Sequence, residues 1–205
     1  MTSEHVRLGR EFYARDTLTV ARELLGQRLV RVMEDGQRLA GIIVETEAYI
    51  GEEDQACHAS HGRTPRNAVM YGPAGFAYIY FIYGMYYCLN VVTEQEGFPA
   101  AVLIRAIEPT EGIPRMQAHR QGRPLHELTN GPGKLCQALA IDRSLNGCDL
   151  CTSPWLFIEL ARQGELRVAA SRRIGVRGDA LARERPWRFF LPDNPFVSHQ
   201  GRAPE

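Results

Sequence analysis

The sequence predicts a mixed α/β (α+β) fold: a single compact domain with a mainly antiparallel, curved sheet, flanking helices and a protruding β-hairpin. Three observations support this. No Ser-, Gly- or Pro-rich linker divides the 205 residues, so one domain over 1–205 is expected. Several runs of β-branched and aromatic residues are separated by short turn-like segments. Helical spacing of apolar residues is found in only a few short segments between them.

The first element predicted is a helix within residues 11–26. Asp16 or Thr17 can cap its N-terminus, and Gly26 can end it. Helical spacing gives it a buried stripe made of Leu18, Ala21, Leu24 and Leu25.

Residues 27–33 and 39–49 predict two strands that pair across the turn-like Glu34-Asp35-Gly36. Alternation along the second strand sorts its side chains into an apolar or small set, Ile42, Val44, Thr46 and Ala48, and an opposite set, Ile43, Glu45, Glu47 and Tyr49. Two carboxylates and an aromatic ring therefore share one face. Most E-x-E patterns on strands are solvated surface, so the pattern alone leaves a solvated face and a reaction site open.

The most aromatic segment, residues 74–92, predicts a hairpin with its tip at Gly84, and residues 100–107 predict a further strand. Tyr78, Tyr80 and Ile82 are expected on one face of the hairpin. Tyr83 lies at the turn. An aromatic ring there either meets a partner or folds back into the core, and the pattern does not choose between them.

Residues 129–141 predict a loop that opens a helix, with Leu135, Ala138 and Leu139 facing inward. The amides at that N-terminus, with Lys134 beside them, could hold a phosphate, although the spacing of a nucleotide-binding loop is absent. The tail, residues 185–197, predicts a last strand and a Pro-stiffened end with a structural role.

Composition narrows the class of protein. No apolar run has the length of a signal peptide or a membrane span, so a cytoplasmic protein without membrane contact is expected. Five cysteines suggest reduced thiols, and Cys148 and Cys151 are expected to be ordinary thiols rather than a zinc or redox pair. The net charge is zero, and Lys134 is the one lysine among 24 basic residues. The other 23 are arginines, which is compatible with nucleic-acid binding but weak support for it.

Several motifs together resemble the alkyladenine (3-methyladenine) DNA glycosylase family. In chain order they are V-E-T-E-A-Y-I-G-E-E-D-x-A-x-H, T-P-R-N, Y-I-Y-F-I-Y-G-M-Y-Y-C-L-N-V-V, L-I-R-A-I-E-P, G-P-G-K-L-C-Q-A-L and R-I-G-V. The resemblance covers nearly the whole chain. It implies a base-excision-repair enzyme that flips alkylated or deaminated purines out of double-stranded DNA and hydrolyses the N-glycosidic bond. It also implies no metal and no cofactor, and we expect a monomer.

The resemblance also assigns roles to single residues. Glu47 is similar to the general base that activates water, and Arg105 to the residue beside it that helps place that water. Tyr49, His58 and Tyr80 are similar to the walls of the base-binding pocket.

Other matched positions would contact the DNA or select the base. Asn90 is similar to the residue that meets the purine's minor-groove edge and disfavours the amino group of guanine. Tyr83 resembles the hairpin residue that wedges into the duplex. Arg66, in the T-P-R-N motif, and Lys134 are expected to contact the DNA backbone.

The chemistry of the residues agrees with these roles. An ionised carboxylate near the anomeric carbon can stabilise an oxocarbenium-like sugar and deprotonate water. Tyr and His rings attract a cationic alkylated purine more than a neutral base. Glycosylases that also cut the strand commonly use an amine, and here only Lys134 and the N-terminal amine could serve. A monofunctional enzyme that leaves an abasic site is therefore expected.

Two other classes of function stay open at this stage. A metal-dependent hydrolase could use Glu45, Glu47, Asp54, His58 and His61, although their spacing matches no standard metal motif. A non-catalytic nucleic-acid-binding module could use the tyrosines as stacking platforms.

Overall fold

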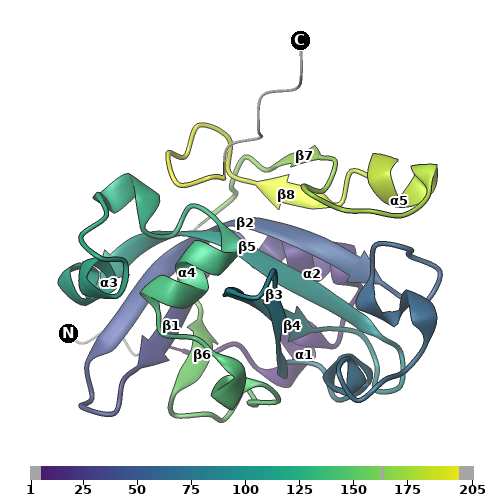
Figure 1. Cartoon of the computed structure of the whole chain (residues 1–205), viewed down its shortest axis with the longest axis horizontal. Helices are drawn as coiled ribbons and strands as arrows, with labels where there is room; N and C mark the ends of the chain where they lie inside the picture. The colour runs from purple at the N-terminus through teal and green to yellow at the C-terminus, as the bar shows by residue number, and fades with distance from the viewer. Residues whose placement is uncertain (1–5, 163, 199–205) are drawn as a thin grey trace.

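A single sheet of eight strands, mainly antiparallel in its pairings, dominates the computed structural model, which describes residues 6–162 and 164–198 (Figure 1). The strand order is β3-β4-β5-β2-β1-β6, with β8 paired to both β2 and β7. The strands are β1 (Arg28–Val32), β2 (Arg38–Ile50), β3 (Ala77–Ile82), β4 (Tyr86–Val92), β5 (Ala100–Glu111), β6 (Leu156–Glu159), β7 (Ala169–Ser171) and β8 (Arg188–Phe190). The predicted fold class, with its hairpin and flanking helices, is confirmed.

Short helices flank the sheet. The described α-helices are α1 (Arg10–Tyr13), α2 (Thr17–Glu23), α3 (Ile113–His119), α4 (Pro132–Ala138) and α5 (Ala180–Glu184), and the 3-10 helices are η1 (His58–His61), η2 (Ala68–Tyr71), η3 (Leu125–Glu127) and η4 (Arg143–Leu145). None of the described helices has the length and apolar character that a bilayer span requires.

The predicted N-terminal helix is present as α2. Asp16, not Thr17, is its cap, because the Asp16 carboxylate accepts a hydrogen bond of 2.8 Å from the amide of Thr19. The Thr17 hydroxyl instead bonds the side chains of Thr93 and Glu94. Ala21 and its apolar neighbours are buried against the sheet, whereas Leu18 is only partly buried.

The faces of β3, β4 and β5 divide the molecule into a core side and a site side. Ile79, Leu89, Val91, Val102 and Ile104 belong to the main hydrophobic core. The intervening residues, Tyr78, Tyr80, Cys88, Asn90, Leu103 and Arg105, line a cavity on the other side. Strict alternation along the strands produces this division, so the predicted common face of Tyr78, Tyr80 and Ile82 is confirmed.

The face assignment predicted for β2 is wrong in its first half. Ile43 packs in the main core with Ala48, whereas Ile42 and Val44 pack with Phe196 in a separate cluster. The reason is a β-bulge, since the register of β2 against β5 shifts twice between Ile43 and Thr46. An extra residue at the bulge exchanges the two faces for the part of the strand that precedes it.

The C-terminal segment closes over the carboxylate face of β2. The predicted last strand is present as β8, which pairs with β2 so that Glu45 lies opposite Phe190 and Glu47 opposite Arg188. Figure 1 shows β7, β8 and α5 lying together along one side of β2. Both glutamates consequently have no solvent-exposed surface, and the solvated-face alternative for this E-x-E pair is wrong.

The hairpin protrudes as predicted, with a turn at Tyr83 and Gly84. Both residues have positive φ, 56° and 69°, and the Met85 amide donates to the Ile82 carbonyl, as in a type I′ turn. Tyr83 is 76% exposed, so it does not fold back into the core. A bulky residue with positive φ costs roughly 1–2 kcal/mol, which Asn or Gly would avoid.

Candidate active site

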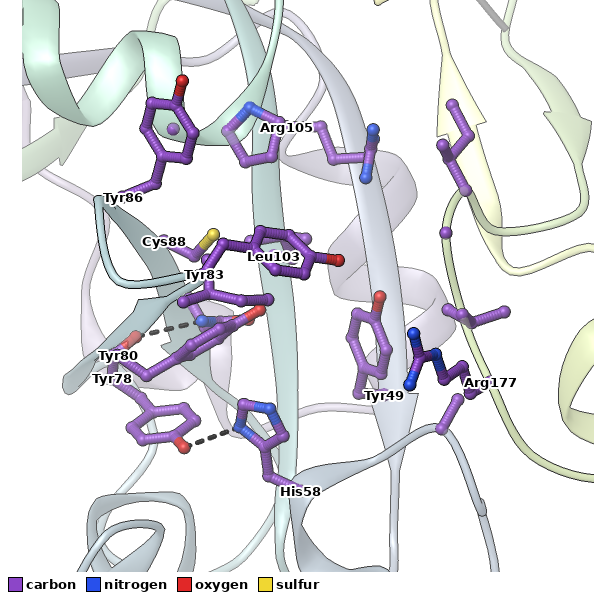
Figure 2. Close-up of a pocket in the computed structure, with 18 of the residues that line it drawn as sticks. Tyr49, His58, Tyr78, Tyr80, Tyr83, Tyr86, Cys88, Leu103, Arg105 and Arg177 are labelled. Carbon is purple, nitrogen blue, oxygen red and sulfur yellow. Dashed lines mark hydrogen bonds between the residues drawn. The ribbon is translucent and has the colours of Figure 1, made fainter. Parts of the chain in front are cut away.

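A cavity of about 400 Å³ opens on the site side of β3, β4 and β5 (Figure 2). Its other borders are the loop around His58, the N-terminal end of α4 at Pro132 and Gly133, and the segment 174–177. Four residues to which the sequence assigned pocket roles, Tyr49, His58, Tyr80 and Asn90, all line it, as do Arg105 and Tyr83. Segments from widely separated parts of the chain therefore meet at one site.

Two of the aromatic rings form one wall. The rings of His58 and Tyr80 meet edge to face with their centroids 4.3 Å apart, so no planar base fits between them. Figure 2 shows Tyr49 on the opposite side of the cavity, its ring facing this pair. A flat ligand would lie between Tyr49 on one side and His58 with Tyr80 on the other.

The His58 ring is fixed and uncharged at neutral pH. Its Nδ1 lies 2.8 Å from the hydroxyl of Tyr78. Partial burial of the ring, and then the nearby positive charge of Arg66, lower the pKa of His58 to about 4. A neutral His58 does not repel a cationic ligand in the slot.

Glu47 lies behind the cavity wall and is held by three donors. The Tyr49 hydroxyl donates to Glu47 Oε2 at 2.8 Å, and Arg105 Nη1 lies 3.2 Å from the same oxygen. The amide of Ile174 donates to Oε1 at 2.6 Å. Oε1 therefore retains one acceptor position for a further donor such as water.

Glu45 is the centre of a second, fully buried cluster beside Glu47. Its carboxylate accepts from Arg105 Nε at 2.9 Å, from Arg188 Nε at 2.6 Å, and from both the amide and the hydroxyl of Ser198 at 2.7 Å. Burial alone would raise the pKa of Glu45, but the charges of Arg105 and Arg188 outweigh it and hold the pKa below its usual value. Glu45 thus anchors Arg105, which also contacts Glu47.

Arg188 and Ser198 were missed in the sequence, where the tail was interpreted as structural only. A signal for Arg188 was present, because it is a lone charge within an aromatic run, W-R-F-F, and such a charge needs a buried partner. Ser198 carried no comparable signal.

A buried ion pair supports Tyr49 from behind. The two terminal nitrogens of Arg173, Nη1 and Nη2, donate to the Asp54 carboxylate at 2.6 and 2.7 Å. The guanidinium carbon lies 4.7 Å from the centroid of the Tyr49 ring and 5.2 Å from that of Trp187. Arg173 was recognised only as part of the R-I-G-V motif, and the structure places it as a rigid support for one wall of the cavity.

Of the remaining predicted residues, Asn90 lies in the cavity itself, whereas Arg66 and Lys134 do not line it. Asn90 is buried in the cavity floor and donates to the Tyr78 carbonyl at 3.1 Å. Arg66 is exposed and donates to the carbonyl of Phe81 on the hairpin at 3.2 Å. Lys134 does not line the cavity, and its ammonium donates to Asn130 at 2.8 Å.

The side chains that a metal-dependent hydrolase would need are occupied by other partners. Glu45 and Asp54 are each bound by buried arginines. Among residues 6–162 and 164–198, no group of three or more His, Cys, Asp or Glu side chains is placed to share a cation. This geometry contradicts the metal cluster. Cys148 and Cys151 are both partly buried and are not joined in a disulfide.

The family of the chain follows from its similarity to known proteins. Residues 11–195 match the family described as methylpurine-DNA glycosylase (MPG). The chain belongs to this family. Its enzyme class is therefore that of the DNA glycosylases, hydrolases of N-glycosyl bonds that act in base excision repair of DNA.

Two relatives match this chain over nearly their whole length. The chain is 53% identical over 201 residues to a protein of Desulfitobacterium hafniense (strain Y51), with 94% of this chain and 98% of the relative covered. It is 54% identical over 198 residues to one of Methanocella arvoryzae, with 96% and 97% covered. Both relatives carry the name "Putative 3-methyladenine DNA glycosylase". The family match thus covers most of the described chain.

Proposed function

We propose that this protein is a monofunctional, monomeric DNA glycosylase that flips damaged purines out of duplex DNA into the aromatic cavity. The observation that carries the proposal is that the buried Glu47 carboxylate contacts Tyr49 and Arg105, two residues that line the aromatic cavity. A purine stacked in that slot would bring its sugar to the mouth of the cavity.

Hydrolysis then needs a nucleophile and charge stabilisation. Cleavage of the N-glycosidic bond develops positive charge on the sugar, which the carboxylate of Glu47 can stabilise. The free acceptor position on Glu47 Oε1 can take a proton from the attacking water. Tyr49 and Arg105 would hold the carboxylate in place through its other oxygen.

Selection of the damaged base would depend on stacking between the aromatic rings and on the contact of Asn90 with the edge of the base. A cationic alkylated purine gains attraction over Tyr49 and Tyr80 that a neutral base lacks. Because Asn90 Nδ2 already donates to Tyr78, the Asn90 amide also meets the base edge with a fixed orientation.

The proposal that the strand is not cut rests on Lys134, the only lysine, since the N-terminal amine lies outside the described residues. Within the described residues no lysine lines the cavity, and the Lys134 ammonium is bonded to Asn130. The product would therefore be an abasic site with an intact backbone.

A panel of duplexes tests this function. Each duplex holds one modified purine: 3-methyladenine, 7-methylguanine, hypoxanthine or ethenoadenine. Release of a free base together with alkali-labile strands is expected for at least one of them. Strand breaks without alkali would contradict the monofunctional mechanism, and binding without base release would indicate a non-catalytic module.

Tyr83 is expected to matter for opening the duplex and not for folding. Tyr83→Ala should lower the excision rate in duplex DNA roughly ten-fold or more while affecting a single-stranded substrate much less, because only a duplex has a vacated stack to fill. Tyr83→Asn is the matched variant, since Asn accepts positive φ and should keep or raise the melting temperature. Equal losses on both substrates, or normal duplex activity in Tyr83→Asn, would remove the wedge role.

Asn90 is expected to discriminate between purines. A donor on Asn90 opposes the amino group that guanine presents on its minor-groove edge. Asn90→Ser should raise the ratio of guanine-type to adenine-type excision by roughly ten-fold. A methylated DNA that contains both 7-methylguanine and 3-methyladenine measures this ratio, because the two lesions compete for the same protein. An unchanged ratio would show that Asn90 does not select the base.

A further inference from the structure

A second, smaller cavity of about 310 Å³ adjoins the first. The two cavities share Ala56, His58 and Arg177 in their linings. The smaller one adds Arg66 and His61, and none of the described residues that line it carries a carboxylate. In a chain with zero net charge, this is a local concentration of basic groups beside the base slot.

Arg177 is a cation with no partner in the described part of the chain. It is exposed, and its guanidinium makes no hydrogen bond, ion pair or ring contact with any described residue. Figure 2 shows it at the rim of the base slot, beside Tyr49. The neighbouring Arg173, by contrast, is buried and paired with Asp54. Arg177 is therefore available for a ligand.

Arg66 contributes positive charge to the same cavity. One of its nitrogens donates to the Phe81 carbonyl, which holds the side chain against the hairpin. Its other N–H groups have no hydrogen-bond partner in the described part of the chain. Its charge acts on His58, a residue of both cavities. The space between Arg66 and Arg177 thus favours an anion.

We propose that Arg177 and Arg66 bind a phosphate of the DNA strand directly next to the flipped nucleotide. The inference rests on the proposed function, which puts the base in the larger cavity and its sugar at the mouth. The phosphodiester attached to that sugar then reaches the smaller cavity, where the planar guanidinium groups match phosphate oxygens. The contact carries no base information, so it positions the nucleotide for every substrate alike.

The salt dependence of binding tests this contact. Affinity for a duplex with one hypoxanthine, and for the same duplex with adenine, is measured over a range of salt concentrations. Each lost phosphate contact should reduce the slope of log K against log[salt] by about 0.9. Arg177→Gln and Arg66→Gln should each show this reduction, whereas Arg177→Lys should keep most of the slope.

Arg162→Gln is the matched control. Arg162 follows β6, at the opposite edge of the sheet from the β3 hairpin, and donates to its own loop at Gly164. Its replacement should leave the slope unchanged. An unchanged slope in Arg177→Gln, or an equal reduction in Arg162→Gln, would overturn the proposal.

Uncharged linkages in the DNA backbone can identify which phosphate the two arginines bind. A methylphosphonate beside the lesion should weaken binding by the wild type but cause little further loss in Arg177→Gln, because both changes remove one interaction. If the losses of affinity caused by the methylphosphonate and by Arg177→Gln simply add, the assignment to that phosphate is wrong. Failure of the wild type to release any base would instead count against the proposed function, and the salt slopes would still report on the phosphate site.

Discussion

Replacing Glu47 by Gln is expected to slow base release by about two to four orders of magnitude while lesion binding persists. The amide keeps the size of the side chain and can still accept from the Ile174 amide, but it cannot take a proton from water. Single-turnover excision with excess protein measures the chemical step, and binding to the same duplex is measured in parallel.

Folding must be followed in the same experiment. Glu47 is buried against Tyr49 and Arg105, so its replacement also costs stability, which the sequence did not indicate. Rates are therefore compared for folded protein, well below the melting temperature. Glu53→Gln, an exposed position in the same acidic segment, should keep full activity. Normal turnover by Glu47→Gln would contradict its assignment as the base.

Replacing Glu45 by Gln is expected to have the largest effect on stability. Arg105 and Arg188, which both bond Glu45, would remain buried without their common counter-charge. Breaking a buried pair in this way costs about 3–5 kcal/mol. For a chain of this size the melting temperature should fall by roughly 6–20 °C. Excision by the remaining folded protein should suffer less than in Glu47→Gln, and equal losses in the two variants would contradict the separation of roles.

The contribution of Glu45 to stability should decrease as the pH falls. Its pKa is lowered in the folded protein, so its ion pairs contribute fully above the ordinary carboxyl value of 4.5 and are lost as the pH falls below it. The difference in unfolding free energy between wild type and Glu45→Gln should shrink over that range.

Glu23→Gln is the control for the loss of stability in Glu45→Gln. It breaks the half-exposed ion pair with Arg15 and should lower the free energy of unfolding by at most about 1 kcal/mol.

The hairpin shows what sequence patterns can predict well. The strands on either side of Tyr83 and Gly84 were predicted because alternation and turn chemistry are local properties. Exposure of Tyr83 was left open, since it depends on whether any other segment covers the tip. In the structure no described segment buries it, and the residue remains 76% exposed.

Strand β2 shows where the pattern fails. Alternation was correct from Glu45 to Tyr49, but a bulge before Thr46 exchanged the faces of Ile42 and Val44. A bulge depends on pairing with β5, which lies far along the chain, so single-strand periodicity cannot reveal it.

The sequence alone determined the class of fold, the hairpin and the residues that resemble a glycosylase site, because these depend on local spacing and on ordered motifs. Only the tertiary structure decided which of these residues are buried and which partners pair with them. Burial of Glu45 and Glu47 requires β8 and Ser198, more than 140 residues later in the chain, to close over β2. The same long-range packing buries Arg173 and leaves Arg177, beside the slot, without a partner among the described residues. Charge pairing in a folded protein is set by which segments meet in space, and no local pattern encodes that.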